Sequence, residues 1–448
     1  MMLAALAWPL VLALLVALPR VRGNLHHLLA LAALPLLGIA AVSAETTMTE
    51  DYPGLLMGMT LGVDGLRWPL LALVAALWTL AGAFASPYLA QSRERARFAV
   101  FWLVCLTGNA GLVLAQDVVT FYGAFALMSF AAYGLIVHDG SGRARAAARL
   151  YMAFAVAGEG VLLAGLLMAV HEAQSLSLAA IPGAIADADS PHAIIGLLVA
   201  GFGIKAGLAG LHFWLPRAHP VAPTPASAVL SGAMIKAGVF GWLVFLPLGD
   251  GSWSGWGVVL GGMGVLGIFG AAMVGVFSRE PKVVLAWSSI SQMGMAALAV
   301  GAALAAPEAA PAVMAAVVAF TFHHGLAKGA LFLASAIGLP DQRVWRWPLI
   351  LMVAWPALAL VGLPGTSGAS AKDALKKALQ PVDGVWAVSV DLLSMGAVAT
   401  AVLMLNFLRC WYRGATRGRA GRWLMLGSWL ALVLLSALLV PLWPMAGT

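Results

Sequence analysis

The residues with the clearest potential for chemistry lie in residues 201–242, GFGIKAGLAGLHFWLPRAHPVAPTPASAVLSGAMIKAGVFGW. Two lysines, Lys205 and Lys236, and two histidines, His212 and His219, occur in apolar sequence on either side of a proline-rich turn. A lysine at the middle of a lipid-facing helix costs roughly 2.5–3.5 kcal/mol on insertion scales, so it normally faces the protein interior and marks an ion path. The stretch therefore predicts a buried proton or cation relay. The alternative is that both lysines lie near helix ends and extend their amines to the membrane surface.

Lysines also occupy the interior of other apolar segments, whereas arginines lie in the polar connections. The remaining lysines inside predicted spans are Lys328, Lys372, Lys376 and Lys377. Arginine stays charged in proteins, whereas a buried lysine loses its proton readily. A residue that gains and loses a proton during turnover should therefore be a lysine, a histidine or a carboxylate. This distribution favours proton transfer inside the membrane.

The composition is that of a polytopic membrane protein. Of 448 residues, 62% are hydrophobic and 10% are charged, and the mean hydropathy is +0.95. A bilayer core needs about 20 apolar residues per helix, so the length allows a dozen or more spans. Arginines in the connections account for the net charge of +7, so no nucleic-acid partner is implied. Cys105 and Cys410 lie far apart and suggest neither a disulfide framework nor a metal site.

Fourteen apolar segments predict an all-α fold. They lie near residues 3–18, 25–42, 68–90, 98–115, 117–137, 150–171, 192–214, 225–248, 255–278, 283–305, 310–337, 348–380, 385–410 and 423–443. The first segment precedes Arg20 and Arg22 rather than following a basic region, so we expect a span and not a cleaved signal peptide. The expected units are helices 1–3 in residues 1–97, helices 4–8 in 98–248, helices 9–13 in 255–412 and helix 14 in 423–448.

Basic and acidic residues alternate between successive connections. The connections after odd-numbered helices carry most of the 25 basic residues, and those after even-numbered helices carry mainly Asp and Glu. Because basic residues concentrate in cytoplasmic loops, the former should be cytoplasmic and both termini should lie on the other side. The basic residues in the connections after odd-numbered helices are Arg20, Arg22, Arg93, Arg95, Arg97, Arg143, Arg145, Arg149, Arg217, Arg279, Lys282, Arg343, Arg346, Arg409, Arg413, Arg417, Arg419 and Arg422. We expect a multi-pass protein of a bacterial-type inner membrane.

Helices 7 and 12 both contain glycine-rich interruptions. Lys205 lies on helix 7 and Lys372 on helix 12, five helices apart, so the two helices cross the membrane in opposite directions. Interrupted helices at corresponding places in two inverted halves indicate the ion site of a transporter. We therefore expect two inverted five-helix repeats, helices 4–8 and 9–13, with broken helices 7 and 12.

Several ordered motifs resemble the antiporter-like subunits of respiratory complex I and their relatives in membrane-bound hydrogenases and Mrp-type cation/proton antiporters. The resemblance covers residues 98–412, most of the chain. Residues 201–238 resemble the signature of helices 7 and 8, especially in the hydrogenase branch. DVVTFYGAFALMSFAAYGL resembles helix 5, PKVVLAWSSISQMG the start of helix 10, FHHGLAKGALFLASA helix 11 and GLPGTSGASAKDALKKAL the broken helix 12.

The resemblance implies a role for each matching residue. In the family, a helix 7 lysine is paired with a helix 5 glutamate, and protons then pass along lysines and histidines of helices 8, 11 and 12. Carried onto this chain, the path contains Lys205, Lys236, Lys328, Lys372, His323 or His324, and Asp373, which directly follows Lys372 as in the family's Lys-Asp pair.

One departure affects the first half of this path. The helix 5 glutamate should fall at residue 126, where this chain has Ala126. Glu159, in the predicted helix 6, is the only acidic residue deep in the first half. A buried carboxylate needs a partner, so Glu159 is expected to pair with Lys205 in place of the missing glutamate. The alternative is that Glu159 is an ordinary helix 6 residue and that the first half-channel is disabled.

Two histidines near the proline-rich turn have simpler alternatives. His212 is expected either to relay protons one turn from Lys205 or to be a turn residue hydrogen-bonded to the backbone. His219 is expected to be structural.

Three functions agree with these residues. The chain is a proton-translocating subunit of a redox-driven complex, a component of a cation/proton antiporter or ion-coupled uptake complex, or a structural membrane subunit that does not pump. It carries no cofactor motif, metal-ligand spacing or nucleophilic triad. A driving redox reaction would therefore belong to peripheral redox subunits, and the expected partners are these, other membrane subunits and the lipid bilayer.

Overall fold

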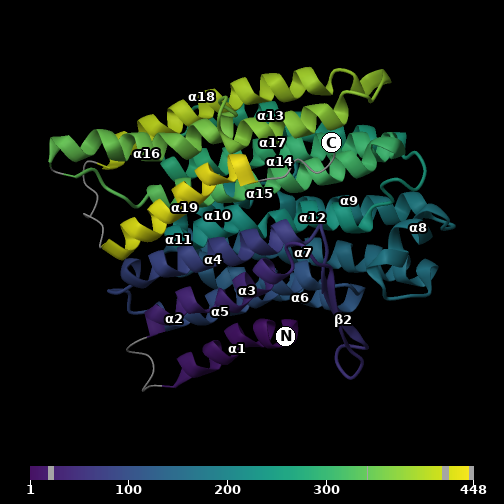
Figure 1. Ribbon diagram of the computed structural model, residues 1–448, viewed down its shortest axis with the longest axis horizontal. Coiled ribbons are helices and arrows are strands. Elements are labelled where there is room, and N and C mark those ends of the chain that lie inside the picture. Colours follow the sequence, from purple (N-terminus) through teal and green to yellow (C-terminus); the bar gives the residue numbers. More distant parts are fainter. Residues whose placement is uncertain (19–24, 341, 416–422, 443–448) are drawn as a thin grey trace.

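A computed structural model shows a bundle of helices that run in roughly one direction (Figure 1). The structure describes residues 1–18, 25–340, 342–415 and 423–442. In the first half the elements are α1 (Met2–Ala17), α2 (Leu25–Leu31), α3 (Leu34–Val42), β1 (Met48–Tyr52), β2 (Met59–Val63), α4 (Trp68–Tyr88), α5 (Arg95–Leu114), α6 (Val118–Ile136), α7 (Gly142–Ala173), α8 (Ile181–Ala186), α9 (Pro191–Ala206), α10 (Leu215–Val221), α11 (Thr224–Val229), a π-helix (Leu230–Met234) and α12 (Lys236–Phe245). The second half contains α13 (Ser254–Gly275), α14 (Pro281–Ala305), α15 (Ala310–Ala334), α16 (Arg343–Val361), α17 (Ser367–Leu379), α18 (Ser389–Ala415) and α19 (Trp423–Leu442).

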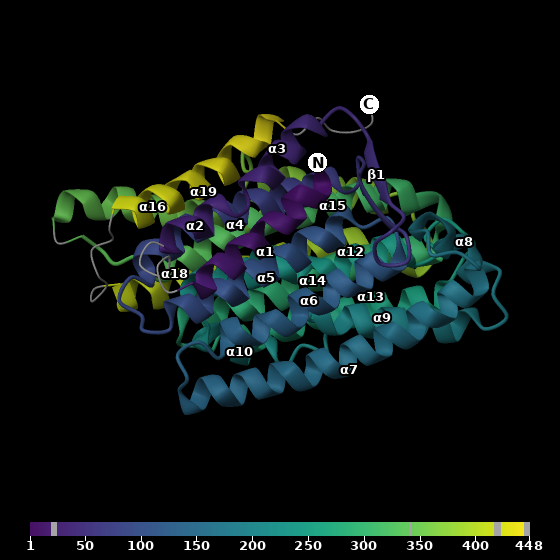
Figure 2. The ribbon, with the colours of Figure 1, turned by 90° about the horizontal axis from the view of Figure 1, so that it is seen from below.

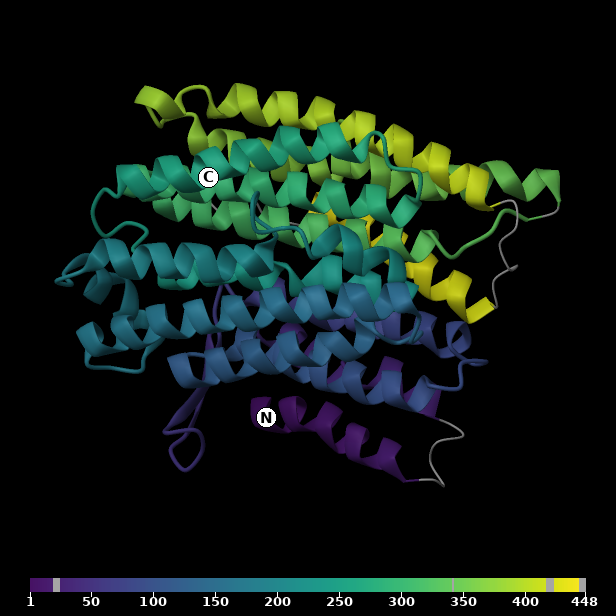
Figure 3. The same ribbon diagram turned by 180° about the vertical axis from the view of Figure 1, so that it is seen from behind.

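The predicted class, an all-α polytopic membrane protein, is confirmed. Within the described ranges, 10 helices are long and apolar enough to cross a membrane, and four shorter apolar helices accompany them. The number of fourteen spans and the inverted repeat stay predictions. Apart from α19, which packs beside α4, helices from the first half of the sequence lie below those from the second half in both Figure 1 and Figure 3.

A two-stranded antiparallel hairpin is the exception to the helical fold. β1 and β2 pair from Met48 opposite Val63 to Tyr52 opposite Met59, in a stretch predicted only as a connection. Met59, Leu61 and Val63 are buried at alternate positions of β2, as the two-residue period of a strand requires. The segment is too short and too polar to span a membrane, so long apolar stretches in the sequence do not indicate it.

The helix that carries Glu159 is longer than predicted. α7 has 32 residues and begins where Ser141 accepts a hydrogen bond from the Ala144 amide at 3.1 Å. The prediction began at residue 150, so Arg143 and its basic neighbours belong to the first turns of the helix and not to a loop. Figure 2 shows α7 along one edge of the bundle, where a long polar start can extend beyond its neighbours.

Glycines set the distance between α13 and α14. A Cβ atom on Gly264 would lie 2.6 Å from the carbonyl oxygen of Gly294, and one on Gly257 would lie 2.5 Å from that of Gly301. Real Cβ atoms essentially never come this close. Small residues are what allow helix backbones to approach closely in membranes. The pair therefore forms a rigid support for the start of the second half.

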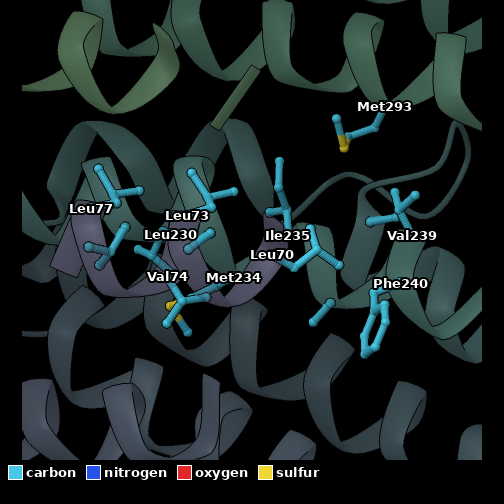
Figure 4. Packing of buried hydrophobic residues seen from close by; sticks show 14 of the residues in the cluster. Leu70, Leu73, Val74, Leu77, Leu230, Met234, Ile235, Val239, Phe240 and Met293 are labelled. Carbon is cyan, nitrogen blue, oxygen red and sulfur yellow. The ribbon is translucent and has the colours of Figure 1, made fainter. Parts of the chain in front are cut away.

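An apolar core surrounds the π-helix. Leu70, Leu73 and Leu77 of α4 lie beside Leu230 of the π-helix and Phe240 of α12 (Figure 4). All five side chains are buried. The first residue of α12, which is one of the predicted lysines, lines a small cavity with members of this core.

Candidate functional site

The first interruption ends α9 directly after Lys205. The next residue but one, Gly207, has a φ of +76°, the left-handed conformation that commonly ends helices and that glycine adopts without strain. α10 then begins at Leu215, with Pro216 in its first turn. Trp214 donates its indole N–H to the carbonyl oxygen of Ile204 at 2.9 Å, and this oxygen also accepts the Gly207 N–H at 3.3 Å, so the end of the helix is satisfied. The predicted break in helix 7 is therefore present, and it holds Lys205 in the last turn of α9.

The Lys205 amine is buried between α6 and α7. Its Nζ donates to Ser129 Oγ at 2.8 Å and to Tyr151 Oη at 3.5 Å. It also lies 5.6 Å from the centre of the Phe125 ring and 5.9 Å from that of Tyr151, within the range of cation–π interactions. Neutral oxygens and ring faces thus solvate the amine.

Glu159 lies in the same cavity as Lys205. The cavity has about 10 Å³ of free volume, about enough for one water molecule, and Ser129 and Tyr151 also line it. The carboxylate and the amine interact electrostatically, but no direct ion pair joins them within the described residues. The Ser129 hydroxyl interacts with both groups. The structure therefore brings Glu159 and Lys205 together through Ser129.

Ala126, where the family's glutamate is missing, lies on the same helix as Ser129. Ala126 lies one helical turn before Ser129 on α6, and it is only half-buried. Glu159 is 4% exposed, and its Oε2 atom has no hydrogen-bond partner in the described part of the chain. A buried carboxylate oxygen without a partner is costly. A carboxylate oxygen that no fixed donor occupies is, however, free to accept a proton.

Lys236 follows the π-helix directly. Its Nζ donates to the backbone carbonyl oxygen of Ser231 within the π-helix. Isolated π-helical turns occur frequently at functional sites. The lysine also lines a second cavity of about 10 Å³, in which Asn109 is the other polar side chain among apolar ones. Lys236 is 3% exposed, so the predicted alternative of an amine at the membrane surface does not describe it.

α15 carries three of the predicted residues on buried positions. His323 Nδ1 lies 2.8 Å from Ser367 Oγ, and that hydroxyl donates to the carbonyl oxygen of Ser436 at 2.9 Å. Since the hydroxyl has one proton to give, His323 Nδ1 is the donor to it, and Nε2 is left as an acceptor. Lys328 Nζ donates to the carbonyl oxygen of Leu285 at 2.8 Å.

His324 stands apart from its neighbour because both of its ring nitrogens lack hydrogen-bond partners within the described ranges. It is fully buried, and it interacts electrostatically with Lys236, Lys328, His323 and Lys372. The ring therefore lies among the other residues of the predicted path.

The second interruption is held by the lysine itself. α16 ends at Val361, the following Gly362 has a φ of +89°, and α17 begins at Ser367. Lys372 Nζ donates to the carbonyl oxygens of Leu360 at 2.8 Å and Val361 at 2.9 Å, which are free because α16 stops there. A cation at a helix C-terminus is also favoured by the helix dipole. The predicted break in helix 12 is therefore present, and its lysine is buried.

Gly368 allows α17 to approach both α16 and α15. A Cβ atom at this position would lie 1.7 Å from the carbonyl oxygen of Ala359 and 2.9 Å from His323 Nε2. The glycine thus brings the unpartnered nitrogen of His323 next to the turn before Lys372.

The remaining predicted residues lie outside this cluster. Asp373 is exposed, on a different side of α17 from the buried Lys372, and Lys377 is exposed as well. His212 lies in the turn between α9 and α10, where its ring stacks on Phe213 at 4.8 Å and contacts the edge of Trp287 at 5.4 Å.

One expected structural histidine and two unpredicted serines lie close to the lysines. His219 is fully buried on α10 and stacks on Phe332 at 4.6 Å, and neither ring nitrogen has a hydrogen-bond partner among the described residues. It interacts electrostatically with Lys236 and Lys328. Its structural role stays a prediction. For Ser129 and Ser231, no sequence signal separates a hydroxyl near a lysine from any other buried serine.

No group of three or more His, Cys, Asp and Glu side chains comes together as a metal site in the described part of the chain. The buried cluster consists of amines, imidazoles, hydroxyls and one carboxylate. These groups can bind and release protons.

The sequence matches the family described as NADH:quinone oxidoreductase/Mrp antiporter, transmembrane, over residues 115–403. It is 30% identical to NADH-quinone oxidoreductase subunit N of Desulforudis audaxviator over 84% of this chain and 79% of that protein. It is 28% identical to hydrogenase-4 component B of Escherichia coli over 62% of this chain, which spans less than half (43%) of that relative.

Two solved structures share the fold. An archaeal respiratory complex, the membrane-bound sulfane sulfur reductase, contains a chain with a TM-score of 0.83 and 21% identity, and the match covers 97% of this chain and 74% of that one. The Mrp complex of Dietzia contains one with a TM-score of 0.81 and 20% identity, covering 97% and 93%. The family match covers more than half of the chain, and the residues matched include both interruptions. The chain therefore belongs to the transmembrane family shared by NADH:quinone oxidoreductases and Mrp antiporters.

Proposed function

We propose that the chain is a proton-translocating membrane subunit of a redox-driven complex, of the complex I-like or membrane-bound hydrogenase type. The observation that carries this proposal is the set of buried protonatable side chains at the two interruptions and between them. They are Glu159, Lys205, Lys236, His323, His324, Lys328 and Lys372.

The way in which the amines are held supports proton transfer. Lys205, Lys236 and Lys372 all donate to neutral oxygens, and none forms a direct ion pair within the described residues. A neutral amine keeps N–H donors and can retain these hydrogen bonds after it loses a proton. Each lysine can therefore change its charge without losing its position.

In this proposal the chain catalyses no redox step. Electron transfer belongs to peripheral redox subunits, and other membrane subunits lie beside this chain in the bilayer. The two structural relatives support the assignment to a larger assembly because both are chains of membrane complexes. Asp373 then faces a neighbouring protein or lipid, and we keep it in the path only as a group at its outer end.

A cation/proton antiporter is the second candidate. The chain is similar to almost the whole length of the protein from the Mrp complex, and it is 31% identical over 64% of its length to a component of a probable K⁺/H⁺ antiporter of Rhizobium meliloti. Redox donors and alkali-cation gradients distinguish the two, since only the first candidate moves protons when electrons flow and no cation gradient is present.

The function is tested at Lys372. A methionine fills a similar volume but cannot carry a proton, so Lys372→Met should leave the complex assembled and lower redox-driven proton uptake in inverted membrane vesicles by about tenfold or more. A pH-sensitive dye reports the uptake with H₂ or NADH as donor. Lys377→Met, on the exposed side of the same helix, is the control and should pump normally. Full pumping by Lys372→Met would remove α17 from the path.

We further propose that Glu159 is the counter-charge of Lys205 in place of the residue missing at position 126. Glu159→Gln should then reduce proton uptake about as much as Lys205→Met, and the double variant should be little worse than either, because residues that act as a unit are not additive. Adding Ala126→Glu to Glu159→Gln should restore part of the uptake. Glu172→Gln, in the last turn of α7, is the matched control. Normal pumping by Glu159→Gln alongside a dead Lys205→Met would show that the lysine needs no such partner.

The proposed orientation places the arginine-rich connections in the cytoplasm of a bacterial-type cell and both termini outside it. Arg143 and Asp187 are exposed; Arg143 lies in the first turn of the long helix α7, and Asp187 lies beyond its end. In intact cells, a cysteine at position 143 should be shielded from a membrane-impermeant thiol reagent, and one at position 187 should react. The reverse pattern would invert the topology.

A further inference from the structure

Two buried serines lie on the way from Lys236, in the first half of the chain, to Lys328, in the second. Ser231 lies in the π-helix, Ser289 lies on α14, and their hydroxyl oxygens are 2.8 Å apart. Both residues are fully buried. Because both hydroxyls are removed from bulk water, each has to find its hydrogen-bond partner inside the protein.

Each serine is joined to a lysine through a backbone carbonyl. Lys236 Nζ donates to the carbonyl oxygen of Ser231 itself. Lys328 Nζ donates to the carbonyl oxygen of Leu285 at 2.8 Å, and Ser289 Oγ donates to the same oxygen at 3.0 Å. Hydrogen bonds thus connect the Ser231 hydroxyl, through Ser289 and the Leu285 carbonyl oxygen, to Lys328, and the carbonyl oxygen of the same Ser231 holds Lys236. A hydroxyl therefore lies next to the acceptor of each amine.

The proton positions of this set follow from the donors available. The one hydroxyl proton of Ser289 is given to Leu285, so Ser289 Oγ must accept from Ser231. Ser231 Oγ keeps lone pairs to which the Lys236 amine can donate. A hydroxyl can accept a proton and release another, whereas a backbone carbonyl can only accept a hydrogen bond.

We propose that the Ser231 and Ser289 hydroxyls form a proton bridge between Lys236 and Lys328, an inference that rests on the proposed proton translocation. The Lys236 ammonium turns from the Ser231 carbonyl oxygen to the hydroxyl of the same residue and gives it a proton. The Ser231 proton passes to Ser289, and the Ser289 proton passes to the neutral amine of Lys328. One N–H bond is broken and one is formed, and both serines end as neutral hydroxyls.

The bridge supplies groups that the lysines alone lack. Lys236 and Lys328 donate to different carbonyl oxygens, and no hydrogen bond joins their amines directly among the described residues. The two hydroxyls supply the donors and acceptors that a proton needs to pass from one amine to the other. The neighbouring His324 interacts with both lysines electrostatically, but it makes no hydrogen bond in the described part of the chain.

The bridge is tested by removing each hydroxyl from the intact complex. Ser231→Ala and Ser289→Ala should each lower redox-driven proton uptake by about tenfold in inverted vesicles at equal amounts of assembled complex, and the double variant should be no worse. Ser288→Ala is the matched control, because Ser288 is the preceding residue on α14, is equally buried and has no hydrogen-bond partner among the described residues. It should pump normally.

A second substitution separates the hydroxyl from packing. Ser289→Thr keeps the hydroxyl and should restore most of the uptake that Ser289→Ala loses. Ser289→Cys, with its weaker donor and acceptor, should stay slow. Full uptake by Ser289→Ala in a strain background where Lys372→Met is inactive would overturn the bridge and leave the proposed function standing. Equal losses in Ser289→Ala, Ser289→Thr and Ser288→Ala would also overturn it, since that pattern reports packing. A fully active Lys372→Met would count against the proposed function itself.

Discussion

The cost of a charge in an apolar interior governs the structure of this chain. An unpaired charge inside a membrane protein is expensive, so it persists only where the protein provides hydrogen bonds or another charge. Here the four lysines of the path are each buried, and each finds one or two oxygen acceptors. Half of those oxygens, the carbonyls of Ser231, Leu360 and Val361, belong to backbone in the π-helix or at the second interruption. The irregular backbone and the buried lysines therefore depend on one another.

The two interruptions meet this cost in different ways. At α9 the Ile204 carbonyl oxygen accepts from the Trp214 indole and the Gly207 amide, and Lys205 interacts instead with side chains of α6 and α7 and with the Glu159 carboxylate. At α16 the free carbonyls are taken by Lys372 itself, and no carboxylate is involved within the described residues. Lys205 is thus held by side chains, with a carboxylate in the same cavity, whereas Lys372 is held by backbone at a helix end.

The sequence predicted the class of fold, both interruptions and the burial of all four lysines, because long apolar segments broken by glycine leave few other structures. It did not predict the hairpin, whose strands are short, or the start of α7, where arginines continue a helix beyond the apolar stretch. It placed Glu159 near Lys205 by elimination, but the intervening Ser129 depends on three-dimensional packing. His219 was expected to be structural because prolines surround it, and its burial arises from packing against the distant Phe332.

If protons cross the chain through its buried lysines, with Lys236 joining the two halves, the number of protons moved per electron depends on Lys236. This number can be measured in the purified complex reconstituted into liposomes, for the wild-type chain and for Lys236→Met. We expect the ratio to fall in the variant while electron transfer can still be measured. An unchanged ratio at an unchanged rate of electron transfer would show that protons do not pass through Lys236.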